Sequence, residues 1–337
     1  MADYFAFNGD ADGLCALQQL RLAEAPQALL VTGVKRDIAL LRRVQAGSGD
    51  RVTVLDISHE QNREEVARLL QDGASIRYFD HHFAGELPAH PGFESYIDTA
   101  ADVCTSTLVN RYLGGRHYRW AIVAAFGDGL PKLGLALAKH HGLPVEHIAE
   151  LEQLGLYLNY NAYGESIADL HFDPAELAEA LRPFVDPLDF IRSSETFATL
   201  RDGYSADMAK AASLTPWRGI PGATLYRLPA APWARRVIGV LANRLLSQRP
   251  DHALALLSSN TDSGFTVSVR VPPEHPLAAD AFCRRFATGG GRKRAAGINH
   301  LPASALASFA EAFENAYGRQ PDDLVPSAIL REQEQPC

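Results

Sequence analysis

The sequence predicts an α/β protein with an N-terminal domain built on a doubly wound parallel sheet, a helical connector and a smaller C-terminal α/β domain. Short apolar runs rich in β-formers alternate with amphipathic stretches from residue 4 to about residue 138, and such repetition favours a parallel sheet. Residues 143–200 carry helical patterns without strand-like alternation. A second pattern of strands and helices begins after residue 222.

Shifts in composition predict the domain boundaries. We expect a first domain over residues 1–200, which includes its closing and connecting helices, and a linker over residues 201–222, where prolines and glycines gather. A second domain is expected over residues 223–318, and residues 319–337 are expected to form a polar tail. Either domain is long enough to bury its own core.

In the first domain, strands are expected where apolar runs end at turn residues, over residues 4–7, 28–31, 52–55 and 76–79. Helices are expected over residues 12–22, 38–44, 61–70, 103–113 and 119–126. The last of these is rich in alanine, which favours a buried helix that carries Asp128 at its end. Thr105, Ser106 and Thr107 open the helix before it, and they either cap that helix or contact a substrate.

In the second domain, strands are expected over residues 223–228, 253–257 and 265–271. The last of these alternates cleanly between apolar and other side chains, with Phe265, Val267, Val269 and Val271 on one face. Helices are expected over residues 234–246, 276–286 and 304–317, with a glycine-rich loop over residues 289–297.

The composition is that of an ordinary globular protein, with 47% hydrophobic and 21% charged residues in a chain of 337. A net charge of −8 argues against long duplex nucleic acid as a partner and favours a small or short anionic substrate. The cysteines are scattered and form no CxxC pair, which predicts free thiols in a reducing cytosol: Cys15, Cys104, Cys283 and Cys337. Without a signal peptide or a long apolar run, the chain is expected to be cytoplasmic and to have no membrane partner.

Acidic and imidazole side chains follow three of the expected strands. The groups are Asn8-Gly9-Asp10-Ala11-Asp12-Gly13, Val54-Leu55-Asp56 and Phe79-Asp80-His81-His82, and Gly127-Asp128-Gly129 follows the alanine-rich run. In an open parallel sheet, residues just past the carboxyl ends of the strands share one crevice. An Asp-x-Asp-Gly run alone is usually a solvated turn, but the coincidence of four such groups at element ends predicts a single site.

The chemistry of these side chains predicts a metal centre. Asp10 and Asp12 can direct their carboxylates towards two neighbouring ions, and Asp56 from the adjacent strand could bridge both. His81 and Asp128 would complete the second ion. Two such ions about 3.5–4 Å apart can activate a water and stabilise an in-line phosphoryl displacement. His82 then remains to meet the charge of the substrate.

These motifs resemble the four motifs of the DHH phosphoesterase superfamily, which includes RecJ-type exonucleases, nanoRNases, cyclic-dinucleotide phosphodiesterases and class II pyrophosphatases. In the second domain, the run from Gly289 to Gly297 is similar to the glycine-rich signature of the DHH-associated C-terminal domain, and residues 267–270 resemble the strand before it. The resemblance spans residues 4–301 and is of the RecJ and nanoRNase-like kind.

The resemblance implies two Mn²⁺ ions, with Mg²⁺ or another divalent ion as the alternative, in a cleft between the two domains. Asp10 and Asp56 would hold the first ion, together with the position of Asn8. The second ion would be held by Asp12, Asp56, His81 and Asp128. Of the catalytic pair, His82 would contact the scissile phosphate and Asp80 would orient its neighbours from behind.

Two positions depart from the family pattern. Many members carry His or Asp where this chain has Asn8, which offers an amide oxygen without charge. The glycine signature usually ends in His, whereas Arg292 stands here, a permanently charged fork suited to phosphate. The residues expected to bind substrate phosphate are Gly289, Gly290, Gly291, Arg292, Arg294 and Arg270.

Several of these basic residues have a simpler interpretation. A glycine loop with basic residues is usually a solvated turn, and Arg270 on the polar face of its strand could be an ordinary surface arginine. Lys35 and Arg36 follow the second strand, and we expect a surface pair at a helix start, with the crevice as the alternative.

The sequence therefore predicts a two-metal, Mn²⁺-dependent phosphoesterase that hydrolyses phosphodiester or phosphomonoester bonds. The expected partner is a small nucleotide or a short single-stranded oligonucleotide, and a homodimer is left open. One alternative is a phosphoanhydride hydrolase of the exopolyphosphatase or pyrophosphatase kind. Another is a catalytically weakened regulatory protein that binds nucleotides, which would hold fewer ions than the enzyme.

Overall fold

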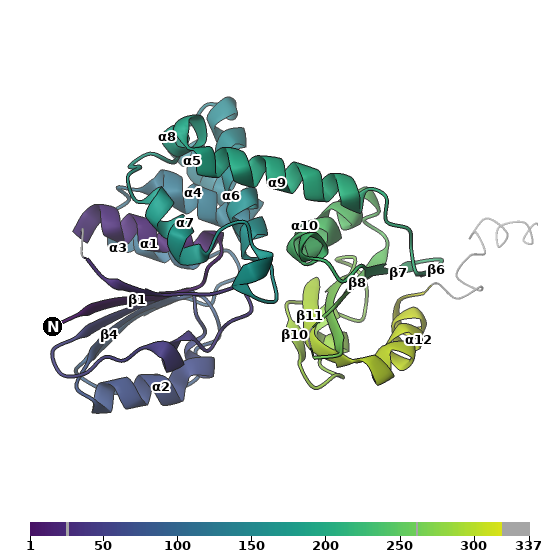
Figure 1. The fold of residues 1–337 in the computed structure, drawn as a ribbon, viewed down its shortest axis with the longest axis horizontal. Helices are drawn as coiled ribbons and strands as arrows, with labels where there is room; N and C mark the ends of the chain where they lie inside the picture. Colours follow the sequence, from purple (N-terminus) through teal and green to yellow (C-terminus); the bar gives the residue numbers. More distant parts are fainter. Residues whose placement is uncertain (25–26, 261, 319–337) are drawn as a thin grey trace, which may run out of the picture. The chain divides into compact units, whose positions relative to one another are not determined.

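The computed structural model describes residues 1–24, 27–260 and 262–318 (Figure 1). Two compact units can be separated: unit 1 comprises Met1–Met208 with Arg235–Val237, and unit 2 comprises Ala209–Ala234 and the chain from Ile238 onward. The tail expected over residues 319–337 lies outside the described residues. The linker expected over residues 201–222 contains the second half of helix α9 (Glu195–Ala211) and the short strand β6 (Arg218–Ile220).

Unit 1 is built on a five-stranded sheet in the order β2-β1-β3-β4-β5, in which every pair of neighbours is parallel. Its strands are β1 (Asp3–Phe7), β2 (Leu29–Val31), β3 (Arg51–Leu55), β4 (Ser75–Asp80) and β5 (Phe93–Ile97). This arrangement confirms the predicted doubly wound sheet. The edge strand β5 was not predicted, because its half-exposed sequence lacks the apolar run of the other four.

Alternation along the strands gives the sheet two apolar faces. Phe5 and Phe7 on β1 belong to one core cluster, whereas Ala6 between them belongs to another on the opposite face. The helices of unit 1 are α1 (Ala11–Glu24), α2 (His59–Gln71), α3 (Thr105–Tyr112), α4 (Tyr118–Gly127), α5 (Pro131–His140), α6 (Val145–Ala162), α7 (Pro174–Leu181), α8 (Pro187–Ser193) and the start of α9. In Figure 1, α2 covers one face, and α1, α3 and α4 lie on the other.

Two further helical segments of unit 1 are short. A helix was expected over residues 38–44, but only the 3₁₀ turn η1 (Leu40–Arg43) forms there. Its Leu40 and Leu41 are fully buried, so the apolar pattern that suggested a helix reflects burial under α2 instead. The second 3₁₀ turn is η2 (Ile167–Asp169).

Unit 2 has a six-stranded mixed sheet in the order β10-β11-β9-β8-β7-β6, in which only β7 and β8 pair in parallel. Its remaining strands are β7 (Ala223–Leu228), β8 (Ala253–Ser259), β9 (Gly264–Arg270), β10 (Gly289–Gly291) and β11 (Ala295–Pro302). Helices α10 (Pro232–Gln248), α11 (Ala279–Cys283) and α12 (Leu306–Tyr317) and the 3₁₀ turn η3 (Ala303–Ala305) accompany them. The predicted inward face of this strand is confirmed, since the apolar residues of β9 and Val271, which directly follows it, are buried.

The glycine-rich segment differs from the expected loop. Gly289–Gly291 form strand β10, which pairs antiparallel with β11, and Lys293 and Arg294 make the turn between Arg292 and Ala295. Arg292 donates its backbone N–H to the carbonyl of Ala295 (2.9 Å) and accepts the N–H of Ala295 in return (3.2 Å). Helix α11 is also shorter than the helix expected over residues 276–286. The glycine run therefore forms the edge of the sheet rather than an irregular loop.

The described helices include none that is both long enough and apolar enough to cross a membrane.

In unit 1, helix α4 packs closely on α1 and α6, and this packing fixes the position of its C-terminal end. A Cβ on Gly127 would lie 2.3 Å from the Cβ of Ala11 and 2.8 Å from the carbonyl oxygen of Gly155. A Cβ on Gly155 would likewise lie 2.3 Å from the carbonyl oxygen of Val123. Glycine at these positions lets the helix backbones approach closely, and this packing positions Asp128 just past the end of α4.

We predict that Gly127→Ala lowers the stability of the protein although alanine is the better helix former. The added methyl group overlaps atoms of two other helices, and such overpacking costs roughly 1–3 kcal/mol of unfolding free energy. Gly47→Ala is the matched control, because its Cβ would meet only the carbonyl oxygen of Asp72, at 3.7 Å. Denaturant unfolding followed by circular dichroism measures both, and equal stability of the two variants would contradict the packing argument.

Candidate metal centre

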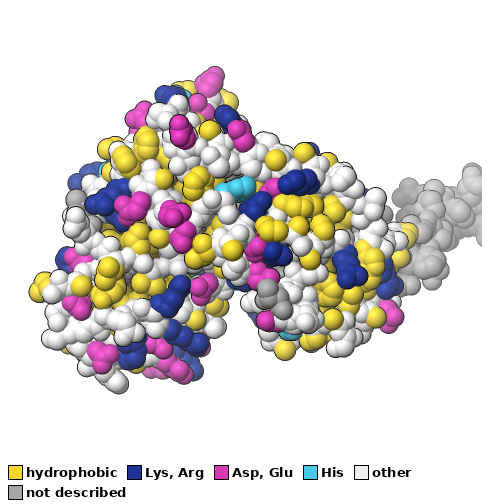
Figure 2. Space-filling view, viewed as in Figure 1, with side chains coloured by type: hydrophobic (Ala, Val, Ile, Leu, Met, Phe, Trp, Pro, Cys, Tyr) yellow, Lys and Arg dark blue, Asp and Glu magenta, His cyan; other side chains and the backbone are white. Residues whose placement is uncertain are grey.

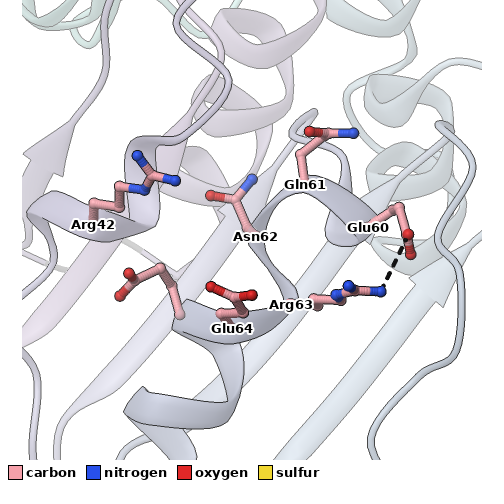
Figure 3. A pocket seen from close by; sticks show the side chains of 7 residues that line it. Arg42, Glu60, Gln61, Asn62, Arg63 and Glu64 are labelled. Carbon is pink, nitrogen blue, oxygen red and sulfur yellow. Dashed lines mark hydrogen bonds and ion pairs between the residues drawn. The ribbon is translucent and has the colours of Figure 1, made fainter.

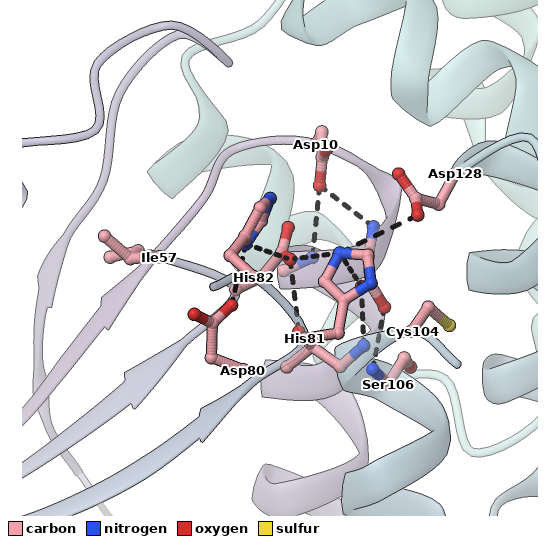
Figure 4. A network of polar contacts seen from close by, with 12 residues as sticks. Asp10, Ile57, Asp80, His81, His82, Cys104, Ser106 and Asp128 are labelled. Atoms are coloured by element: carbon pink, nitrogen blue, oxygen red, sulfur yellow. Dashed lines mark hydrogen bonds and ion pairs between the residues drawn. The ribbon is translucent and has the colours of Figure 1, made fainter. Parts of the chain in front are cut away.

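The predicted acidic and imidazole groups of unit 1 come together at the carboxyl edge of its sheet (Figure 4). The strand order reverses direction between β1 and β3, and ligands of open α/β sheets bind at such a switch point. Asp10 and Asp12 follow β1, Asp56 follows β3, and His81 and His82 follow β4. The sheet topology therefore explains why these separate motifs meet.

Asp12 is held by the first turn of helix α3. Its Oδ2 accepts the backbone N–H of Thr105 and its Oδ1 accepts the backbone N–H of Ser106, both at 2.7 Å. N–H groups in the first turn have no partner within the helix, and the positive end of the helix dipole favours an anion there. The hydroxyl-rich start of α3 thus contributes backbone donors to the site, a role that side-chain types in a sequence do not reveal.

His81 lies at the centre of the carboxylates. Its Nε2 is 3.4 Å from Oδ1 of Asp56, 3.8 Å from Oδ2 of Asp128 and 4.0 Å from Oδ2 of Asp12. Ligand atoms of an octahedral ion with bonds of about 2.1 Å lie about 3.0 Å apart when adjacent and about 4.2 Å apart when opposite. The observed separations fall within these limits, so His81 could share a divalent ion with each of these carboxylates, and Asp12, His81 and Asp128 lie close enough together to hold one ion.

The ring of His81 is fixed from behind. Its Nδ1 contacts the carbonyl oxygen of Val103 at 2.8 Å, which requires the proton on Nδ1 and leaves Nε2 to face the carboxylates. Metal-binding histidines are oriented in this way by a partner of the other ring nitrogen.

Asp56 has a left-handed backbone with φ of 59°, which is uncommon for a residue other than glycine. Its backbone N–H donates to the carbonyl of Phe79 (3.0 Å), and its Oδ1 accepts the hydroxyl of Thr105 (3.1 Å). Such strained residues cluster at functional sites, where the surrounding structure holds them in place.

Burial and mutual repulsion shift the acidity of this group. Burial, and then the charge of Asp56, raise the pKa of Asp12 well above its usual range. Burial, and then the charge of Asp10, raise the pKa of Asp56 to about 6. Burial disfavours the charged imidazole of His81, but Asp56, Asp12 and Asp128 outweigh it and raise the pKa of His81 to about 10. A bound divalent cation would relieve this excess of negative charge.

His82 and Asp80 form a pair beside the carboxylates. Nδ1 of His82 lies 2.7 Å from Oδ1 of Asp80, whose side chain is fully buried, whereas the side chain of His82 is 43% exposed. Burial opposes the charged form of His82, but the hydrogen bond and charge of Asp80, with the charge of Asp56, raise its pKa. The contact with Asp80 uses Nδ1 of His82, and Nε2 of the same ring takes no part in it.

The side chain of Asp10 forms an ion pair with Lys35. Its Oδ1 accepts the backbone N–H groups of Asp12 (3.0 Å) and Gly13 (3.2 Å), and its Oδ2 accepts the ammonium group of Lys35. Burial would lower the pKa of Lys35, but the charge of Asp10 outweighs it and raises this pKa above its usual range. The side chain of Lys35 is only 27% exposed, so the expected surface lysine is wrong and the crevice alternative holds.

The two predicted ion sites therefore differ in how well their residues fit a metal. Asp12, His81 and Asp128 could hold an ion together, as could Asp56, His81 and His82. In the first predicted site, Oδ1 of Asn8 is buried without a hydrogen-bond partner among the described residues, but its neighbour Asp10 is already engaged.

The predicted substrate-binding residues all belong to unit 2. Arg292, Lys293 and Arg294 are exposed at the tip of the β10–β11 hairpin. Arg270 lies on β9, where it donates to Oδ1 of Asn243 (2.8 Å) and to Oγ of Ser268 (3.1 Å). Around Gly290, a Cβ would meet no atom within 4 Å, so this part of the edge strand is open.

A hollow elsewhere in unit 1 carries no comparable chemistry. It lies beside η1 and α2 and is lined by Arg42 and residues 60–65, none of which is a predicted ligand (Figure 3). The guanidinium of Arg63 pairs with Glu60 at 3.4 Å, and the amide of Asn62 binds the carbonyl of Ile38 at 2.7 Å. On the face shown in Figure 2, basic and acidic side chains are interspersed and form no basic stripe.

No protein-family model and no curated protein sequence matches this chain. Solved structures do. A DHH-domain protein described as a member of a family of ribosomal proteins has a TM-score of 0.66 at 13% identity, over 93% of this chain and 86% of its own. An exonuclease RecJ bound to manganese has a TM-score of 0.61 at 18% identity, over 96% of this chain and 91% of its own. The pGpG-specific phosphodiesterase PggH from Vibrio cholerae has a TM-score of 0.54 at 13% identity, over 94% of this chain and 100% of its own.

We predict that binding of Mn²⁺ to the metal-free protein releases at least one proton. A metal ion needs the unprotonated Nε2 of His81, whose pKa is raised to about 10. The apparent affinity should therefore increase about tenfold per pH unit through neutral pH. Calorimetry in two buffers of different protonation enthalpy counts the protons.

The variant His81→Ala should lose this proton release together with most of the affinity for Mn²⁺. His90→Ala is the control, since His90 is exposed in the same unit. Binding without proton release, or unchanged binding in His81→Ala, would show that His81 is not a ligand.

Proposed function

We propose that this chain, which has the fold of the DHH-domain proteins, is a metal-dependent phosphoesterase acting on short oligonucleotides or small nucleotides. It would hydrolyse phosphodiester or phosphomonoester bonds. The observation that carries the proposal is the cluster of Asp12, Asp56 and Asp128 around Nε2 of His81, beside the exposed ring of His82. The carboxylates and His81 could hold a metal, and His82 could meet an anionic substrate.

The metal would be held by the same four residues, and Mn²⁺ fits a donor set of carboxylates with one imidazole. A bound divalent ion would polarise a phosphoryl oxygen and lower the pKa of a bound water. Val103 keeps the ring of His81 turned towards the carboxylates. The first turn of α3 holds Asp12, and Thr105 steadies Asp56 through its hydroxyl group.

His82 is suited to contact the reacting phosphate. Its Nδ1 is held by Asp80, and the exposed ring can direct Nε2–H to a phosphate oxygen or to the leaving oxygen. The raised pKa of His82 favours the protonated ring that such donation requires. Asp80 thus acts as the residue that orients His82.

The substrate class is supported by charge and by the relatives. Arg292, Lys293 and Arg294 give unit 2 a local positive tip in a chain of net charge −8, which suits a short anion better than a long duplex. RecJ is described as an exonuclease, bound to manganese, and PggH as a phosphodiesterase specific for pGpG. We extend this chemistry to the present chain, as a cytoplasmic protein, as part of the proposal.

The experiment that tests the proposal is a turnover panel with Mn²⁺. Its substrates are dinucleotides, longer oligonucleotides, 3′-phosphoadenosine 5′-phosphate, cyclic dinucleotides and polyphosphate. Cleavage of a nucleotide substrate is the expected result. Turnover of polyphosphate alone would identify a phosphoanhydride hydrolase, and metal-dependent nucleotide binding without any turnover would identify a regulatory protein. Either result would overturn the proposal.

We predict that Asp56→Asn and His81→Ala abolish turnover. Loss of a residue behind a metal ligand already costs roughly 10- to 100-fold, so loss of a ligand should exceed about 100-fold in kcat/KM. Asp102→Asn removes an exposed carboxylate of the same unit and should leave kcat/KM unchanged. Full activity in either ligand variant would refute the assignment of the metal centre.

We predict that Arg292→Ala raises KM for a nucleotide substrate and leaves Mn²⁺ binding intact. Hydrogen bonds to charged groups contribute about 1.5–3 kcal/mol, which corresponds to roughly a 10- to 100-fold change in KM. Arg284→Ala is the control, because Arg284 is an exposed arginine of unit 2 that pairs with Asp280 (3.4 Å). An unchanged KM in the Arg292 variant would exclude this residue from substrate binding.

A further inference from the structure

The ammonium group of Lys35 lies beside a carboxylate that the family pattern gives to a metal ion. Lys35 follows β2, the strand next to β1, so it reaches the same edge of the sheet as Asp10. Its Nζ donates to Oδ2 of Asp10 and to Oδ1 of Asn159 (3.1 Å), and it lies 4.0 Å from Oδ1 of Asp128. Its backbone N–H donates to the carbonyl of Ala162 at the end of α6 (2.9 Å). Lys35 is therefore held both at its backbone and at its ammonium group.

The carboxylate of Asp10 already faces a cation. A carboxylate has about four lone-pair positions, two on each oxygen. Oδ1 uses both of its positions for the N–H groups of Asp12 and Gly13. Oδ2, the oxygen that remains to reach an ion, already accepts Lys35. An ion at this position would have to displace the ammonium group or lie directly beside it.

Asp12 contrasts with Asp10 on this point. Each of its oxygens accepts one backbone N–H, from Ser106 and Thr105, which leaves a lone pair on each for an ion. The ammonium of Lys35 lies 4.0 Å from Oδ1 of Asp128, whereas Oδ2 of Asp128 lies 3.8 Å from Nε2 of His81. The first predicted ion site therefore already holds the ammonium group of Lys35, whereas the oxygens of Asp12 in the second accept only backbone N–H groups.

We propose that Lys35 is a built-in cation that takes the place of the first divalent ion, so that this chain binds a single exchangeable divalent ion at Asp12, Asp56, His81 and Asp128. The proposal concerns the metal centre of the function proposed above and rests on it for its catalytic meaning. Asn8 supports it, because an amide oxygen brings no negative charge that could attract a second ion against the ammonium group. Lys35 would supply a positive charge beside the reacting phosphate, in the position where a metal ion would otherwise supply it.

The test compares the unmodified protein with Lys35→Met, which keeps most of the length of the side chain and removes its charge. Mn²⁺ bound after dialysis is counted by elemental analysis, and electron paramagnetic resonance separates isolated ions from magnetically coupled pairs. We expect one isolated ion in the unmodified protein. The variant should bind two coupled ions, because Asn8, Asp10 and Asp56 then become available together.

The affinity for the second ion sets the expected size of the effect. Repulsion between a divalent ion and an ammonium group about 4 Å away, even in the dielectric of bulk water, corresponds to a factor of about 30. The second ion should therefore bind at least about 30-fold more tightly to Lys35→Met than to the unmodified protein. Asn159→Ala, which removes an anchor of the ammonium group, should produce a smaller gain in the same direction.

Control variants separate the charge at Lys35 from charge in general. Lys139→Ala removes an exposed lysine of the same unit and should leave one ion bound. Lys35→Arg keeps the cation and should also leave one ion. Circular dichroism establishes that each variant is folded before its metal content is counted.

Three results would overturn the proposal: two tightly bound ions in the unmodified protein, a single ion in folded Lys35→Met, or a gain of the second ion in Lys139→Ala. These readouts do not depend on turnover. Failure of the substrate panel with one bound ion would refute the proposed function and leave the role of Lys35 standing, whereas turnover with two bound ions would do the opposite.

Discussion

The convergence of buried carboxylates at one edge of a parallel sheet is the constraint on which the rest of unit 1 depends. Parallel strands end at the same edge, so Asp10, Asp12 and Asp56 meet there, and each is almost fully buried. Like charges in such a place repel one another strongly, as the raised pKa values of Asp12 and Asp56 indicate. The surroundings must supply positive charge or hydrogen-bond donors for the site to persist.

The neighbouring elements meet this requirement in different ways. The first turn of α3 donates two backbone N–H groups to Asp12, Lys35 donates its ammonium group to Asp10, and His81 lies among the remaining oxygens. The glycine-mediated packing of α4 on α1 and α6 then determines where Asp128 stands. Helices that are far apart in the chain thereby contribute to the charge balance of the same site. A mutation in their packing is expected to act on the site without touching it.

The predictable part of this site consists of side chains that follow apolar strands, because strand ends and chemically unusual runs such as Asp80-His81-His82 can both be recognised in one sequence. The fold that the motifs implied is confirmed by the solved structures. Lys35 was misassigned because the segment after β2 has no periodic pattern. The neighbouring sequence therefore does not indicate the direction of its side chain. The backbone donors of α3 were missed because every residue type except proline carries an N–H group. The glycine run was taken for a loop, since glycine is rare in strands and its pairing with β11 depends on distant residues.

Asn8 and Lys35 can be understood together, as a single change in the charge of the site. Compared with an Asp at the position of Asn8, the amide removes one negative charge, and Lys35 adds one positive charge beside Asp10. Together they shift the local charge by the amount that one divalent ion would contribute. A site altered in this way needs one ion fewer to reach the same balance against its carboxylates. The phosphate of a substrate would still meet positive charge on both sides, from the remaining ion on one and from an ammonium group that cannot dissociate on the other. Under the proposal for Lys35, the uncharged amide of Asn8 is thus compensated for within the same crevice.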